Sequence, residues 1–137
     1  IDTTIPPSVP RPDDAAEVVA KANAARPAAG LAPLTIHPAL VSAARAHSHD
    51  QASTGRMTHV GSDGSDAGTR IVRAGFTPRT WGENVAMGYR TATAVFDGWM
   101  SSPGHRANIL HDGFALIGVA VAYATDGTPY WTMVLAA

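Results

Sequence analysis

The 137-residue chain contains no cysteine, which excludes disulfide bonds and thiolate metal sites without identifying the compartment. Charged residues are also scarce, at 15% of the chain, and the ten basic residues nearly cancel the eleven acidic ones. A formal charge of −1 gives no electrostatic basis for binding nucleic acid or an anionic membrane surface. Apolar runs stay short of the about 20 residues that a membrane-spanning helix needs. We therefore expect no nucleic acid partner and no transmembrane segment.

A chain of this length is typical of one domain, and it can bury a sufficient core without cross-links. Residues 1–12 hold four of the ten prolines, which fix backbone angles and remove hydrogen-bond donors. We predict an extended N-terminal arm over 1–12 and a single folded domain over 13–137, and we expect a monomer.

Apolar periodicity and chain-breaking residues predict four helices. Asp13 and Asp14 can cap the first, and Pro38 suits the first turn of the second. Gly75 suits the end of the third, and Pro103-Gly104 is expected to stop the fourth. The predicted helices cover residues 13–26, 38 to about 54, 66–74 and 93–102.

Three segments read as strands, over residues 82–87, 114–124 and 130–135. Asp126-Gly127 is a good hairpin turn between the last two. Both of these C-terminal strands are apolar on both faces, which indicates a sheet covered on both sides. The sequence therefore predicts an α+β fold, a three-layer α-β-α sandwich around a small antiparallel sheet of about three strands.

Three side chains in the chain could carry chemistry together. Glu83, one of only two glutamates, interrupts an apolar, strand-like run. His105 follows Pro103-Gly104, where a side chain can be aimed rather than buried. With His59 upstream, two imidazoles and a carboxylate could meet in one cleft.

The same residues carry a family resemblance. The run Trp81-Gly82-Glu83-Asn84-Val85-Ala86, followed by Trp99-Met100-Ser101-Ser102-Pro103-Gly104-His105-Arg106-Ala107-Asn108-Ile109-Leu110, resembles the bacterial branch of the CAP superfamily. That superfamily groups cysteine-rich secretory proteins, antigen five and pathogenesis-related proteins. Upstream matches, which bring the resemblance to roughly residues 15–136, are Asn23-Ala24-Ala25-Arg26, Leu31-Ala32-Pro33-Leu34, the 38–51 helix and Met57-Thr58-His59.

The resemblance implies the three-layer fold and a cleft that holds two histidines and two acidic residues. His59, Glu83 and His105 match three of these four positions, whereas Ser102 stands where the second glutamate would fall. A mechanism that needs two carboxylates is therefore in doubt. Bacterial members usually follow a secretion signal, and this chain begins at Ile1 rather than Met. We accordingly expect a secreted, extracellular protein whose signal peptide has been removed.

Two neutral imidazoles can each offer one ring nitrogen to Zn²⁺ or another divalent cation. Glu83 is the natural partner for the second nitrogen of one of them. Two protein ligands make an under-coordinated site, so we expect weak, exchangeable, pH-dependent binding by His59 and His105. The alternative is that both histidines only hydrogen-bond across a polar cleft.

Several neighbouring polar residues have competing interpretations. Asp63 could reach the cleft, but Asp in such a Gly- and Ser-rich loop more often stabilises its own turn. Asn84 is interpreted mainly as structural, although it could orient the cleft. A serine nucleophile formed by Ser101 or Ser102 with His105 and Asp97 lacks the strand-turn-helix elbow that such sites use.

The remaining histidines and the tryptophans are expected to be structural. His47 should be a hydrogen-bonded core residue and His49 exposed, and His111 could be either a loop or a site residue. The three tryptophans are most simply core anchors, and they are Trp81, Trp99 and Trp131.

Three functions remain open. The first is a non-catalytic extracellular binding module whose cleft accepts a small molecule, lipid or peptide. The second is a metal-assisted hydrolase with Glu83 as general base on a metal-bound water. The third is a host- or envelope-interaction protein whose cleft is vestigial.

Overall fold

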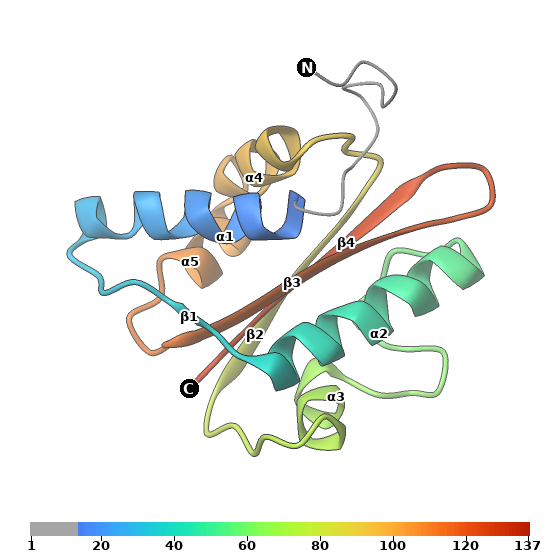
Figure 1. Cartoon of the computed structure of the whole chain (residues 1–137), viewed down its shortest axis with the longest axis horizontal. Helices are drawn as coiled ribbons and strands as arrows, with labels where there is room; N and C mark the ends of the chain where they lie inside the picture. Colours follow the sequence, from blue (N-terminus) through green and yellow to red (C-terminus); the bar gives the residue numbers. More distant parts are fainter. Residues whose placement is uncertain (1–13) are drawn as a thin grey trace.

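The computed structural model describes residues 14–137 (Figure 1). The predicted arm over 1–12 and the capping role of Asp13 lie outside this range. The helices of the described part are α1 (Asp14–Ala25), α2 (Pro38–Thr54), α3 (Ala67–Arg73), α4 (Ala92–Met100) and α5 (Pro103–Ile109), with a 3₁₀ turn at Pro27–Ala29. Its strands are β1 (Thr35–Ile36), β2 (Trp81–Met87), β3 (Leu116–Tyr123) and β4 (Pro129–Ala136).

The fold is the predicted three-layer α-β-α sandwich. Figure 1 shows α2 and α3 on one face of the sheet and α1, α4 and α5 on the other. The strand order is β1-β3-β4-β2, with β4 antiparallel to both β3 and β2. The prediction of about three antiparallel strands missed β1, a two-residue strand that runs parallel to β3 and forms one edge. Strand β2 forms the other edge.

Strand β4 is buried along its whole length because its two faces enter two different cores. Its residues Trp131, Met133 and Leu135 pack with α1 and α4 in one cluster. Its residues Val134 and Ala136 pack with α2 and α3 in the other. Side chains alternate faces along a strand, so a continuous apolar run is what a doubly covered strand requires.

Helix α2 lies very close to β3, and Gly118 makes this possible. A Cβ atom at Gly118 would lie 2.3 Å from the main-chain carbon of Leu40 and 2.3 Å from the nitrogen of Val41. Both are backbone atoms of α2, which cannot rotate away. The neighbouring positions on the same face of β3 are also small, namely Ala120 and Ala122.

The fourth predicted helix, over 93–102, is α4, and a further helix that was not predicted, α5, follows it. Helix α4 ends at Met100, and α5 begins at Pro103, so Pro103 starts a helix instead of only stopping one. Proline is favoured in the first helical turn, where its missing N–H costs nothing. His105 therefore sits in the first turn of α5 rather than in a loop.

The tryptophan prediction holds for two of the three residues. Trp99 and Trp131 are buried, and their indole N–H groups donate to the carbonyl oxygens of Val85 and Tyr89. Trp81 is 42% exposed, so its prediction as a core anchor was wrong. It lies at the start of an edge strand, where no further strand covers it.

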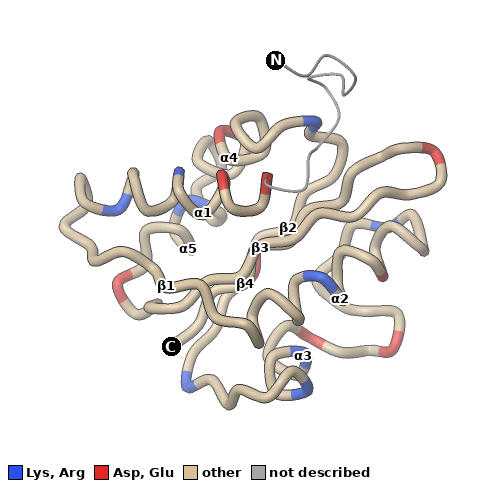
Figure 2. Tube along the Cα trace, in the orientation of Figure 1, with Lys and Arg blue, Asp and Glu red and all other residues tan. Residues whose placement is uncertain are grey.

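Within the described residues, no helix combines the length and hydropathy needed to cross a membrane. Figure 2 shows acidic and basic residues spread over helices and loops, without a continuous face of one sign. This distribution agrees with the near-zero net charge.

Candidate functional site

Glu83 is a buried carboxylate whose two oxygens are both occupied. Its side chain is 2% exposed and lies in β2. Arg70 of α3 donates from Nη2 to Oε2 at 2.8 Å, and His59 donates from Nδ1 to Oε1 at 2.9 Å. A buried charge is tolerated only when it is paired and hydrogen-bonded, and these two contacts meet that requirement.

His59 lies over Glu83 with its side chain 61% exposed. The hydrogen bond to Glu83 raises the pKa of the His59 imidazole above its ordinary value, against a smaller opposing effect of burial. Because Nδ1 is taken by the carboxylate, Nε2 is the ring nitrogen that His59 has left for a ligand.

The loop that carries His59 is fixed by side chains of α2 and α3. His47 Nε2 donates to the carbonyl oxygen of Thr58 at 2.5 Å, and Gln51 Oε1 accepts from the Thr58 N–H at 3.1 Å. Arg70 Nη2 also donates to the carbonyl oxygen of His59 at 3.0 Å. His47 and Gln51 lie one helical turn apart and are buried, so α2 holds both main-chain groups of Thr58.

His47 is the hydrogen-bonded core residue that the sequence predicted, with no exposed side-chain surface. Its Nε2 also lies 4.0 Å from Glu83 Oε1. Burial lowers the pKa of His47, and this outweighs the opposite effect of Glu83. The imidazole is therefore held neutral beside the ion pair of Glu83 and Arg70.

His105 is positioned by a second set of contacts, on the other side of β2. The buried Asn84 donates from Nδ2 to the carbonyl oxygen of His105 at 3.1 Å and accepts from Asn108 Nδ2 at 2.9 Å. His105 Nδ1 and Ser102 Oγ are hydrogen-bonded at 2.8 Å. Ser102 thus contacts the imidazole from the position where the family would carry its second glutamate. As in His59, Nε2 remains available.

The two imidazoles flank the outer edge of β2. Glu83 and Asn84 are consecutive in the strand and point to opposite faces, toward His59 and toward α5. The charge of His59 and burial together lower the pKa of His105, with burial the larger effect. The sheet edge between them continues into an apolar groove of about 300 Å³, whose lining includes Met57, Met87, Tyr89 and His105.

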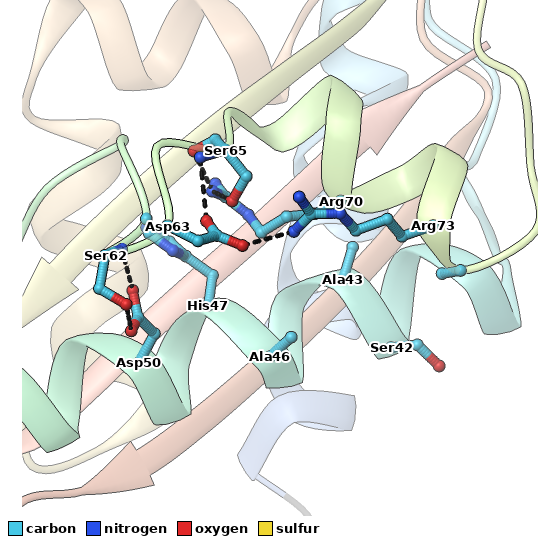
Figure 3. Close-up of a pocket in the computed structure, with 12 residues that line it drawn as sticks. Ser42, Ala43, Ala46, His47, Asp50, Ser62, Asp63, Ser65, Arg70 and Arg73 are labelled. Atoms are coloured by element: carbon cyan, nitrogen blue, oxygen red, sulfur yellow. Dashed lines mark hydrogen bonds and ion pairs between the residues drawn. The ribbon is translucent and has the colours of Figure 1, made fainter.

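A separate hollow of about 420 Å³ lies between α2, α3 and the loop that joins them (Figure 3). Asp63 lies here, where it accepts from the Ser65 N–H at 3.0 Å and from Arg73 Nη1 at 2.6 Å. These contacts lower the pKa of the exposed Asp63 carboxyl. Asp63 therefore has the turn-stabilising role that was the preferred interpretation, rather than a place beside His59.

The structure thus brings His59, Glu83, Asn84, Ser102 and His105 together at one edge. Three further residues complete the arrangement, and they are Arg70, Gln51 and Asn108. No local signal marks Arg70, because an arginine on a short amphipathic helix ordinarily faces solvent. Asn108 belongs to the run that carries the family resemblance, so it could have been considered.

The other candidates lie elsewhere. His49 is exposed, as predicted, and so is His111, whose Nδ1 accepts from the N–H of Gly113 at 2.8 Å. Asp97 is exposed on α4. The Ser102 hydroxyl contacts His105, but it sits at the start of α5 rather than at a strand-to-helix elbow. The described residues contain no group of three or more His, Cys, Asp and Glu arranged to hold a metal ion.

Comparison with known proteins relates the chain to one family. Residues 19–135 match the model of the cysteine-rich secretory protein family, CAP. The uncharacterized protein YkwD of Bacillus subtilis (strain 168) is 37% identical over 116 residues, which cover 85% of this chain and 44% of that protein. The chain therefore spans less than half of this relative.

Solved structures agree on the fold. An extracellular protein of Bacillus anthracis that contains an SCP domain superposes with a TM-score of 0.79 at 24% identity, over 90% of this chain and 40% of that chain. An outer surface protein of Borrelia burgdorferi gives a TM-score of 0.83 at 20% identity, over 99% of this chain and 95% of that chain. The extent of the family match and the identity to the Bacillus subtilis relative show that the chain belongs to the cysteine-rich secretory protein (CAP) family.

Proposed function

We propose that this chain is an extracellular, non-catalytic binding module whose ligand occupies the cleft between His59 and His105. One observation carries the proposal: the Glu83 carboxylate is 2% exposed and already bonded on both oxygens. A general base must lie within hydrogen-bond reach of water or substrate, whereas Glu83 is buried beneath His59 and Arg70 with each oxygen already engaged. Its role is instead to orient His59.

The absence of a second carboxylate supports the same view. Ser102 occupies that position, and its hydroxyl contacts His105 instead of supplying an acid or base. An extracellular location is supported by two structural neighbours, one described as extracellular and the other as an outer surface protein.

We further propose that the cleft binds a divalent transition metal such as Zn²⁺ weakly. His59 and His105 each have Nδ1 engaged and Nε2 left over, which is the arrangement of a metal-binding histidine. The pairing of Glu83 with His59 fixes the tautomer that such a ligand needs. Two nitrogen ligands without a third protein group favour an exchangeable ion rather than a structural one.

Calorimetric titration of Zn²⁺ near neutral pH tests the metal proposal. Wild type should bind one ion per chain, and His59→Ala and His105→Ala should each weaken binding at least about tenfold. His49→Ala is the matched control, because it removes an exposed imidazole away from the cleft. Equal zinc binding by His105→Ala and wild type would show that the ion, if bound, lies elsewhere.

A panel of peptide and ester substrates, with and without zinc, tests the non-catalytic part. No turnover is expected above the buffer rate. Zinc-dependent turnover that disappears in Glu83→Gln would replace this proposal with the hydrolase alternative.

A further inference from the structure

Strand β2 has main-chain hydrogen-bonding groups on its outer edge that β4 does not use. In an antiparallel pair, alternate residues bond the neighbouring strand. The Gly88 N–H donates to Pro129 at 2.9 Å, so the even-numbered residues of this stretch face β4. Glu83, Val85 and Met87 consequently direct their N–H and C=O groups outward, away from the sheet.

Most of this edge is closed, since Glu83 and Val85 are each 6% exposed, whereas Met87 at its end is 41% exposed. Asn108 Nδ2 donates to the Glu83 carbonyl at 3.4 Å, and Trp99 Nε1 donates to the Val85 carbonyl at 3.1 Å. By contrast, the outward N–H and C=O groups of Met87 have no hydrogen-bond partner among residues 14–137. The open end of the edge at Met87 can therefore pair with one extended segment.

The apolar groove runs along the same stretch of β2. Met57 and Met87 are 48% and 41% exposed, and Tyr89 is 38% exposed. None of the residues that line the groove is an Asp, Glu, Lys or Arg. Methionine side chains are flexible and polarisable, so they can adapt to apolar groups of different shape.

Tyr89 lines this groove next to α4. Its ring lies against Gly98 of α4, where an added Cβ atom would come within 2.6 Å of the phenol oxygen. Its carbonyl oxygen accepts from the indole N–H of Trp131 at 2.8 Å. A groove lined by an aromatic ring and two adaptable methionines is a surface suited to an apolar side chain.

We propose that the apolar groove binds an extended peptide segment, which pairs with the main-chain groups of Met87 at the uncovered end of β2 and seats an uncharged apolar side chain between Met57, Met87 and Tyr89. This inference rests on the proposed binding function and names its ligand class. Main-chain bonds would supply affinity and the groove would supply selectivity, as in other cases of strand addition. The imidazole of His105 lines the same groove.

An acyl chain fits these observations less well. It would cover the outward N–H and C=O groups of Met87 without bonding them, and burying polar groups without a partner is unfavourable. A volume of about 300 Å³ is also at the lower end of ligand pockets, which suits one or two side chains.

The probes for the test are blocked pentapeptides, acetyl-Thr-Thr-X-Thr-Thr-amide, in which X is Leu, Ile, Phe, Met or Asp. They are titrated into ¹⁵N-labelled protein while amide shifts are followed. At least one apolar peptide should shift the amides of β2 and of the Met57 segment, and the Asp peptide should bind at least about tenfold more weakly. If none of the apolar peptides shifts these amides at several millimolar, the proposal is wrong.

Two N-methylated forms of the best peptide test strand geometry. One carries the methyl group on the amide of X and the other on the next residue. Because alternate amides face the protein, one form should lose at least about tenfold in affinity and the other less than about threefold. Equal losses would exclude strand addition.

Met87→Pro and Met87→Leu are the matched protein variants. Proline removes an N–H that β4 does not use, and edge strands tolerate it there. Met87→Pro should weaken peptide binding at least about tenfold, Met87→Leu less than about threefold, and neither should alter zinc binding. If the wild-type protein binds peptide but does not bind zinc, only the metal proposal is wrong. If Met87→Pro does not fold, titration of the N-methylated peptides into the wild-type protein tests the strand geometry instead. Decanoate shifting the same amides where no peptide does would assign the groove to a lipid.

Discussion

Replacing Glu83 with Gln should destabilise the domain by about 3–5 kcal/mol, the range measured when one partner of a buried ion pair is removed. The estimate follows from burial, because the side chains of Glu83 and Arg70 are 2% and 6% exposed. After the substitution, the Arg70 guanidinium stays buried against the carbonyl oxygens of Ser65 and His59 without a counter-charge. A surface ion pair would contribute only about 0–1 kcal/mol.

Glu17→Gln is the matched control, since Glu17 is the other glutamate and is exposed in the first turn of α1. Removing the Glu17 charge should lower the free energy of unfolding by less than about 1 kcal/mol, mostly through the lost interaction with the helix dipole. Urea unfolding followed by circular dichroism compares the two variants, and an unchanged m-value shows that only stability has changed. For a chain of this size, the melting temperature of Glu83→Gln should fall by about 10–20 °C.

The same variant has a second readout. The hydrogen bond to Glu83 is the largest cause of the raised pKa of His59, so the His59 pKa should fall in Glu83→Gln. Titration of the imidazole by NMR measures this directly. The account of a buried ion pair is refuted if Glu83→Gln unfolds within 1 kcal/mol of Glu17→Gln and leaves the His59 pKa unchanged.

Three further outcomes are expected. Zinc binding should weaken as pH falls through the raised pKa of His59, because protons compete with zinc for the same imidazole. Calorimetric titrations at pH 7.5 and 5.5 measure this change in zinc affinity, and equal affinities would contradict the prediction. The folded-state pKa of His47 lies below its unfolded value of about 6.5, so the unfolded chain binds more protons and stability should be lost as pH falls below that value. Urea unfolding at pH 7.5 and 5.5 should show a smaller loss in His47→Gln, which cannot titrate, and an equal loss would point to another group. Gly118→Ala should cost at least about 3 kcal/mol of stability or prevent folding, whereas Gly104→Ala, with open space around its added Cβ, should change stability by less than about 1 kcal/mol. Thermal unfolding compares the two variants. Similar stabilities would mean that α2 does not approach β3 as described.

Local signals in the sequence predicted most of the elements because each depends on a few neighbouring residues. Gly55 ends α2 with a left-handed backbone, at φ of 67°, and Pro38 begins that helix. The continuous apolar runs of β3 and β4 predicted a sheet with two covered faces. Helix α5 was missed because Pro103 is compatible with both a stop and a start, and no local rule chooses between them.

By itself, the sequence determined the three-layer fold, the family, and the set formed by His59, Glu83 and His105. Only the tertiary structure decided what these side chains do. The pairing of Glu83 with Arg70, the hold of His47 and Gln51 on Thr58, and the exposure of Trp81 all depend on which elements become neighbours. That choice rests on the strand order, which places β2 beside the C-terminal β4 and at an edge. Such long-range pairing is driven by the packing of two cores at once, and no short stretch of the chain contains that information.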